Sequence, residues 1–145
     1  MNNERDNMIH GEQLNFKTKG FSDIINITQE VKEVIDKSQI RDGIVSVSTI
    51  GSTASITIIE YEPNLVQDMK EQLQKFFPKD MKTRHGETWG DDNGFSHLRA
   101  SFLGASETFP IKKGKIVLGT WQQIVVIDHD NNPRNRKVFV QIVGD

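Results

Sequence analysis

Apolar or β-branched residues alternate with polar ones in seven short segments, a period of two that is typical of half-buried β-strands. Small or turn-forming residues separate several of these segments, as in IGSTA, KKGK and HDNNPRN. Asp128, His129 and Asp130 precede or begin the last of these turns, and we expect them to be solvated. The predicted strands span residues 13–19, 44–49, 55–61, 106–111, 115–119, 120–128 and 136–144.

Three other segments carry apolar residues at intervals of three to four, the spacing of a helix with one buried face. They are residues 28–40, 65–77 and 95–104. Thr28 and Asn93 are suited to cap the first and third helices, and Pro78 ends the second. Strands and helices interleave unevenly, which predicts an α+β fold, a sandwich of mostly antiparallel strands with about three helices. We expect a flexible N-terminus over residues 1–12 and one domain over 13–145.

The third predicted helix has two contrasting faces when successive residues are placed at 100° intervals around the helix axis. Phe95, Leu98 and Phe102 fall on one arc, which we expect to face the core. The opposite arc holds Asn93, His97, Ala100 and Gly104. His97 therefore points away from the apolar stripe, among small residues that would let a ligand approach. A histidine satisfied within the core is the alternative.

Composition narrows the class of protein. The 145 residues are 35% hydrophobic and 26% charged, with a net charge of -2, which fits one globular domain and does not suggest general nucleic-acid binding. The absence of cysteine excludes disulfides, thiolate metal sites and a cysteine nucleophile. The chain start lacks the apolar core of a signal peptide, and no run is long enough for a membrane helix. We expect a cytoplasmic protein with no membrane partner.

The segment RHGETWGDDNGFSH, residues 84–97, is the densest in reactive side chains. His85, Asp91 and His97 are six residues apart, and two imidazoles with a carboxylate can form a site for a divalent metal, Zn or Mg, that keeps positions open for substrate. Glu87 or Asp91 could instead orient an imidazole as a general base. An ordinary turn and helix cap at residues 91–93 is the third interpretation.

The same segment has features of an anion site. The start of the predicted helix after Asn93 offers unpaired N–H groups, and Gly90 and Gly94 would let phosphate or pyrophosphate come close. Arg84 and Arg99 flank it as further candidates for substrate binding. The sequence lacks a complete EF-hand loop, a P-loop and a dinucleotide fingerprint.

Other candidates lie elsewhere in the chain. Ser52 and Thr53 occupy a glycine-containing turn, where they could bind an anion or only cap strand ends. Glu60 stands at a predicted strand end beside a second acid. Trp121 and Gln122 could stack on and hydrogen-bond a heteroaromatic ring, although a buried tryptophan is more often part of the core.

Several separated motifs resemble the YjbQ family of small uncharacterised proteins. They are GSTASITIIEYEP, RH…GDDNGFSHLRASFLG, KIVLGTWQQIVVID and VFVQIVGD, and the resemblance covers about residues 16–145. It implies a compact α+β β-sandwich assembled as a homotrimer, with a weak thiamine-phosphate synthase activity and a polar cleft near the subunit contacts. The positions matched to the family's shared polar residues are His85, His97, Asp91, Asn93, Glu60, Ser52, Thr53, Trp121 and Gln122.

The chain departs from the family pattern at four positions. Ile59 and Tyr61 replace asparagines beside the strand-end acid, Gly86 replaces an asparagine, and Phe95 replaces a histidine. These changes leave the proposed acid-base or metal set intact but alter the walls of the cleft, and therefore the substrate.

Three functions are consistent with these residues. The first is a metal-assisted enzyme of the thiamine-phosphate synthase kind, acting on small phosphorylated heterocycles with His85, His97, Asp91 and Glu60 as catalytic residues. The second is a non-catalytic homotrimer that binds a metal or a phosphorylated metabolite. In the third, the polar cluster is a network of contacts between subunits.

Overall fold

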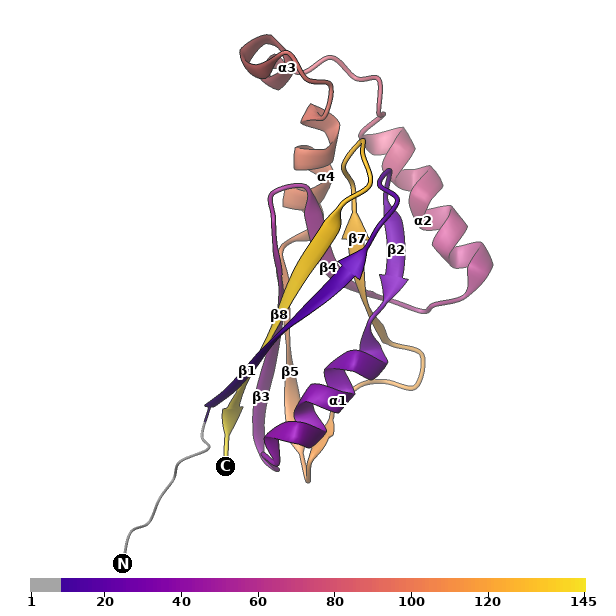
Figure 1. Ribbon diagram of the computed structural model, residues 1–145. Coiled ribbons are helices and arrows are strands. Elements are labelled where there is room, and N and C mark those ends of the chain that lie inside the picture. The colour runs from indigo at the N-terminus through magenta and orange to yellow at the C-terminus, as the bar shows by residue number, and fades with distance from the viewer. Residues whose placement is uncertain (1–8) are drawn as a thin grey trace, which may run out of the picture.

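A computed structural model describes residues 9–145, which form eight strands and four helices (Figure 1). In chain order these are β1 Ile9–Lys17, β2 Asp23–Asn26, α1 Thr28–Ser38, β3 Gly43–Ile50, β4 Ala54–Ile59, α2 Pro63–Phe76, α3 Arg84–Trp89, α4 Gly94–Leu103, β5 Ser106–Lys112, β6 Lys115–Ile116, β7 Gln123–Asp128 and β8 Asn135–Gly144.

The strands form two antiparallel sheets, which confirms the predicted α+β class. One sheet has the order β1-β8-β3-β5-β6, and the other has the order β2-β7-β4. The first strand begins earlier than predicted, since His10 pairs with Ile142 and Glu12 with Val140. Residues 9–12 are therefore sheet and not a flexible terminus, while residues 1–8 lie outside the described part.

The core lies between the two sheets and under α1. Val31, Val34 and Ile35 of α1 pack with the inward side chains of β3, β5 and β8 and with Ile124 and Val126 of β7. The alternate residues of β7, Val125 and Ile127, face the other way, against partly buried side chains of α2 and α4. This strand is buried on both faces, which explains its continuous apolar sequence.

Two predicted strands are shorter than expected. β6 spans only Lys115–Ile116, and β7 begins at Gln123, so Trp121 and Gln122 lie in a turn before it. Gln122 closes this turn, because its Oε1 accepts a hydrogen bond from the Gly119 N–H at 2.7 Å. A side-chain bond of this kind competes with the sheet ladder for the backbone.

The buried face of α4 differs from the predicted one. Phe95 is buried as expected, but Leu98 is 37% exposed and Phe102 is 75% exposed. Arg99 and Ala100 are buried in their place. The helix is rotated because the Arg99 guanidinium finds hydrogen-bond acceptors inside the protein, so the cation turns inward and two apolar side chains turn out.

The segment before α4 contains a short helix, α3, that the sequence did not predict. It ends at Gly90, which adopts a left-handed conformation with φ of 71°. α3 lies at one end of the molecule, while α1 lies near the other (Figure 1). No helix within residues 9–145 is long and apolar enough to cross a membrane.

Candidate functional site

His85 on α3 and His97 on α4 come together at the end of the molecule that carries α3. Nδ1 of His85 lies 2.9 Å from Oδ1 of Asp91, and the two side chains are 30% and 46% exposed. The His85 and His97 rings are 4.6 Å apart between centroids and tilted by 46°. An N–H on Nδ1 of His85 can donate to this carboxylate, which leaves Nε2 as the atom for acid-base chemistry or for binding a metal.

Glycines allow this arrangement. The left-handed Gly90 turns the chain back after α3. Gly94 packs directly on the residue that precedes α3, since a Cβ at this position would lie 2.0 Å from Oγ1 of Thr83. The starts of α3 and α4 are thereby held side by side, which places His85 against His97.

Asn93 connects this pair of helices to the buried part of the protein. Its amide nitrogen, when turned toward Asp91, donates to the two carboxylate oxygens at 3.0 and 3.3 Å. In the opposite orientation it lies 3.4 Å from Oδ1 of Asp130. Asn93 immediately precedes α4 as predicted, but its side chain makes no cap hydrogen bond, and its NH2 group donates to only one of these two carboxylates in a given orientation.

Residues 128–130 are buried, and the prediction that they are solvated turn residues was wrong. Asp128, His129 and Asp130 are at most 1% exposed. Nη2 of Arg136 donates to Oδ1 of Asp128 at 2.7 Å, and Thr53 donates to Asp130 at 3.1 Å. Their charges are tolerated because each carboxylate has a cation and further hydrogen bonds.

His129 is the centre of this buried network and is neutral. Its Nδ1 lies 2.7 Å from Oγ of Ser22, and its Nε2 lies 2.9 Å from Oγ of Ser55. Burial, reinforced by the positive charge of Arg99, lowers the pKa of His129 to about 3. The ring is inaccessible, so we assign it a structural role.

Arg99 was expected to bind a substrate anion, and its environment argues against that role. It donates to the Phe77 carbonyl at 2.7 and 2.9 Å, to Gln74 at 3.0 Å and to Ser22 at 3.0 Å. Burial lowers the pKa of Arg99 to about 10, so it remains charged at neutral pH. Arg99 joins α4 to the end of α2 and to the loop before β2.

The remaining predicted site residues separate into two groups. Thr53 is buried in the network beside Asp130, whereas Ser52 and Arg84 are exposed. Glu60 and Trp121 line a different cavity of 410 Å³ at the far end of β4, with Gln122 in the adjoining turn. Within one chain, Glu60, Trp121 and Gln122 therefore do not meet His85.

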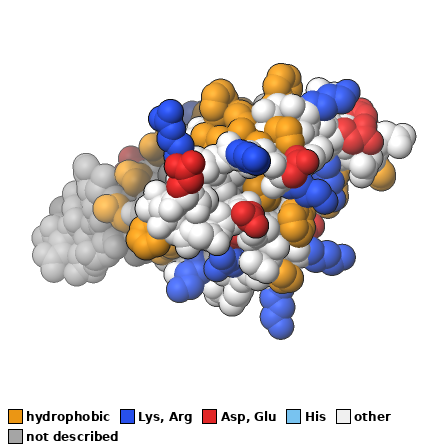
Figure 2. Space-filling model, turned by 90° about the horizontal axis from the view of Figure 1, so that it is seen from above, with side chains coloured by type: hydrophobic (Ala, Val, Ile, Leu, Met, Phe, Trp, Pro, Cys, Tyr) orange, Lys and Arg blue, Asp and Glu red, His pale blue; other side chains and the backbone are white. Residues whose placement is uncertain are grey.

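A cavity of 770 Å³ opens beside Asp91, within the size range of small-molecule sites. Figure 2 looks onto this end of the molecule and shows acidic, basic and apolar side chains intermixed. Phe21 lines this cavity, and the sequence pattern did not identify it, because a single phenylalanine before a strand carries no distinctive signal. The lining residues are Phe21, Lys79, Asp80, Met81, Lys82, Thr83, Gly86, Glu87, Asp91, Asp92, Phe95 and Asn131.

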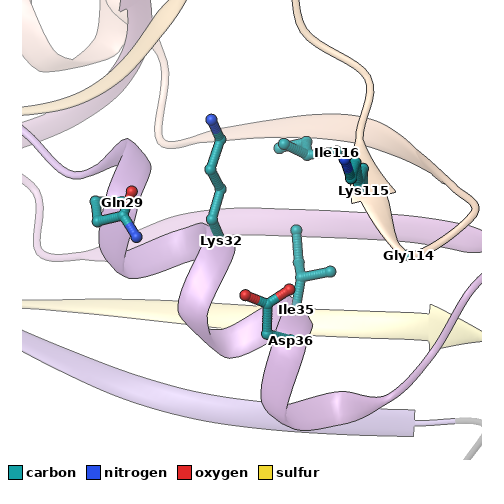
Figure 3. Close-up of a pocket in the computed structure, with 7 residues that line it drawn as sticks. All are labelled: Gln29, Lys32, Ile35, Asp36, Gly114, Lys115 and Ile116. Atoms are coloured by element: carbon teal, nitrogen blue, oxygen red, sulfur yellow. The ribbon is translucent and has the colours of Figure 1, made fainter.

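A smaller cavity of 320 Å³ lies near the opposite end, between α1 and the β5–β6 turn (Figure 3). Its side chains include Lys32 and Asp36, one helical turn apart, and the apolar Ile35 and Ile116. This lining has only one carboxylate, whereas the 770 Å³ cavity has four, including the Asp91 that contacts His85, so we place the candidate site at the His85 end.

The metal prediction remains a prediction. Within residues 9–145, no group of three or more histidine and acidic side chains is arranged to hold a metal ion. Asp91 contacts the nitrogen of His85 rather than extending beside it as a third ligand. The two imidazoles and an orienting carboxylate nevertheless match two ligands and one supporting residue of a zinc site.

Comparison with known proteins gives one consistent result. The family model described as "UPF0047 protein YjbQ-like" matches residues 12–145. A UPF0047 protein of Methanothermobacter thermautotrophicus is 38% identical, over 94% of this chain and 93% of its own. A UPF0047 protein of Archaeoglobus fulgidus is 36% identical, over 89% and 98%.

Solved structures agree in fold. A YbjQ-like protein of unknown function from Sulfolobus solfataricus has a TM-score of 0.90 at 32% identity, covering 94% of this chain and 98% of that one. An uncharacterized conserved protein of the yjbq/upf0047 family from Clostridium acetobutylicum has a TM-score of 0.83 at 38% identity, covering 91% and 99%.

The fold and site define a small α+β protein of two antiparallel sheets, with a histidine–aspartate pair beside an open cavity. The family model, both relatives and the Clostridium acetobutylicum structure carry the UPF0047 description. The chain belongs to the YjbQ (UPF0047) family.

Proposed function

We propose that this protein is an enzyme acting on small phosphorylated heterocycles, in the manner of a thiamine-phosphate synthase. The observation that supports this best is the 2.9 Å contact between His85 and Asp91, with His97 beside it. Asp91 lines the 770 Å³ cavity although neither histidine does, and an imidazole oriented by a carboxylate is the arrangement of a general acid or base.

The reaction joins a pyrimidine methyl pyrophosphate to a thiazole phosphate. The thiazole nitrogen attacks the methylene carbon, a C–N bond forms, and the C–O bond to pyrophosphate breaks with its electron pair on the leaving oxygen. His85 would act here with both ring nitrogens protonated, Nδ1 facing Asp91 and Nε2 donating a hydrogen bond or proton to that oxygen. Arg84, which is exposed at the start of α3, is free to approach the phosphate oxygens.

A divalent metal would neutralise the charge of the leaving pyrophosphate. In place of that proton, His85 would hold the metal through Nε2 together with His97, with Asp91 fixing the first ring. Elemental analysis of the parent protein and a folded His97→Ala variant tests this assignment. A stoichiometric ion that is lost in the variant supports it, and an ion kept in both contradicts it.

In a homotrimer, Glu60, Trp121 and Gln122 could contribute to the site of a neighbouring copy. Leu98 and Phe102 form an apolar strip on the outside of α4, as expected of a surface that packs on another copy. Glu60, Trp121 and Gln122 of a neighbouring copy would then complete the site. Sedimentation of a Phe102→Glu variant tests this, with Phe76→Glu on α2, which is 72% exposed, as the control.

Non-catalytic binding of a metal or phosphorylated metabolite is the alternative, and the openness of the site favours it, since Asp91 is 46% exposed. One experiment separates the two functions. The protein is incubated with both substrates and Mg²⁺ or Zn²⁺, and pyrophosphate release and thermal stability are measured. An enzyme releases pyrophosphate, whereas a binding protein is stabilised without forming product.

A further inference from the structure

Phe21 presents an aromatic ring to the 770 Å³ cavity and is 48% exposed. Gly20, Phe21 and Ser22 have φ values of 81°, 52° and 63°, three consecutive residues in the left-handed region. For residues with a side chain this conformation costs energy, and such residues persist where the surrounding structure holds them. The chain bends at this point and turns the phenyl ring away from the core.

Buried residues hold this bend in place. The N–H groups of Phe21 and Ser22 donate to the carbonyls of Asp130 and Asp128, both at 2.7 Å. The hydroxyl of Ser22 lies 2.7 Å from His129 and accepts a hydrogen bond from Arg99 at 3.0 Å. The buried polar network therefore fixes the backbone from which Phe21 projects.

The ring of Phe21 lies near a second aromatic ring and a cation. It is parallel to the buried ring of Phe95, with an interplanar angle of 6° and 6.4 Å between centroids. Arg99 lies 4.9 Å from the Phe95 ring, and Nζ of Lys79 lies 5.6 Å from the Phe21 ring. Lys79 shows that the face of Phe21 accepts a cation, because the π-face of an aromatic ring attracts positive charge.

The charge of the cavity favours the same kind of ligand. Its lining has two lysines, Lys79 and Lys82, against four carboxylates, and one of the four is Asp91. A planar ring with positive charge would gain from both the phenyl face and the acidic surroundings. A phosphate or pyrophosphate group would need the metal of the proposed function to offset this negative lining.

We propose that Phe21 is the stacking platform for a planar heterocycle that carries or develops positive charge, and that this ring displaces the ammonium group of Lys79. The inference rests on the proposed function, since a heterocycle alkylated on its nitrogen becomes such a cation. It assigns the ring to Phe21, beside Asp91, within the same chain.

The test uses a pair of probes that differ in charge, 1-methylnicotinamide and neutral nicotinamide, with binding followed by NMR titration of the full-length protein. We expect the cation to bind more tightly and to shift the Phe21 ring resonances. Phe21→Leu keeps the bulk and backbone conformation but loses the π-face, so affinity falls about two- to thirtyfold, the range of a cation–π contact. Phe21→Tyr retains binding, and Phe76→Leu, which alters an exposed ring on α2, leaves it unchanged.

The direction in which Lys79→Met changes the affinity for the cationic probe decides whether the inference is right. Removing the competing ammonium tightens binding of the cationic probe about threefold if the inference is right. Weaker binding in this variant, equal binding of both probes, or no binding to the parent protein overturns it. If the protein fails these tests but releases pyrophosphate, the proposed enzymatic function is retained and the role of Phe21 is rejected. If the cationic probe binds through Phe21 but no pyrophosphate is released, the role of Phe21 is retained and the enzymatic function is rejected.

Discussion

Nδ1 of His85 lies 2.9 Å from Oδ1 of Asp91, and the same imidazole leans against His97. The carboxylate and both rings belong to one short stretch of chain, folded back on itself between α3 and α4. The contact decides which nitrogen of His85 can react, because the nitrogen facing Asp91 is already engaged. Nε2 is therefore the atom on which the proposed chemistry depends.

The tautomer of His85 is the first testable consequence. We expect neutral His85 to carry its proton on Nδ1, and Asp91→Ala to shift the ring toward the Nε2–H form that isolated histidine favours. Nitrogen chemical shifts from ¹⁵N-labelled histidine measure this directly. Asp92→Ala, the neighbouring exposed acid, should leave the tautomer unchanged, and an Nε2–H ring in the parent would contradict the assignment.

Gly94→Ala should separate α3 from α4. Alanine ordinarily stabilises a helix relative to glycine by about 0.5–1 kcal/mol, but here its Cβ would lie 2.0 Å from Oγ1 of Thr83. We expect a lower melting temperature and loss of nuclear Overhauser contacts between His85 and His97. The double variant Gly94→Ala/Thr83→Gly removes the clash and should restore the contacts. If Gly94→Ala alone keeps the contacts between His85 and His97, the packing described here is wrong.

Arg136 and Arg134 offer a matched comparison of a buried and an exposed cation near the same carboxylates. The Arg136 side chain is 8% exposed and bonds Asp128 at 2.7 Å, whereas that of Arg134 is 49% exposed and bonds Asp130 at 2.8 Å. Arg136→Met should lower the free energy of unfolding by about 3–5 kcal/mol because it leaves a buried carboxylate unpaired. Arg134→Met should cost less, because Arg134 is itself half exposed and Asp130 keeps Arg136 at 3.8 Å and the hydrogen bond from Thr53. Urea denaturation measures both, and equal losses would contradict the assignment.

The buried His129 should make the protein sensitive to mild acid. Its pKa is about 3 in the folded protein against 6.5 for the ordinary value, so the unfolded chain binds the proton first. Stability is therefore full above pH 6.5 and falls by roughly 1.4 kcal/mol per pH unit below it, until the folded pKa is reached. The lowered pKa of Asp130 adds a loss only below its ordinary 3.8.

Urea unfolding at pH 7.5, 6.5, 5.5 and 4.5 tests this slope. NMR of the His129 ring in the folded protein supplies a second measurement that needs no variant. Its resonances should stay constant from pH 7.5 to 4.5, and a midpoint near 6.5 would show that the ring is not held neutral.

Seven of the eight strands were predictable because their local pattern reflects their burial, whereas the short β2, Asp23–Asn26, was not predicted. β7 reads as an uninterrupted apolar run and is covered on both faces, and the closeness of His85 and Asp91 follows from six residues of separation across a glycine turn. The buried face of α4 was not predictable in this way. Arg99 turns inward only because acceptors from Phe77, Gln74 and Ser22 meet it there.

The burial of Asp128, His129 and Asp130 depended equally on distant partners. Thr53 and Ser55 lie more than 70 residues away in sequence, and no local pattern relates them to a polar segment that resembles a turn. The role suggested for Phe21 has the same origin, since its exposure follows from the strained backbone and not from its neighbours in sequence.

The central claim is that His85, oriented by Asp91, is the reactive group. The most direct measurement compares kcat for pyrophosphate release in the parent, His85→Gln and His10→Gln. His10 is a matched control, because it forms a 2.9 Å contact with Glu12 on β1, in a different part of the molecule. We predict a loss of about 10²- to 10⁴-fold for His85→Gln at unchanged melting temperature and none for His10→Gln. Equal kcat in all three proteins would contradict the claim.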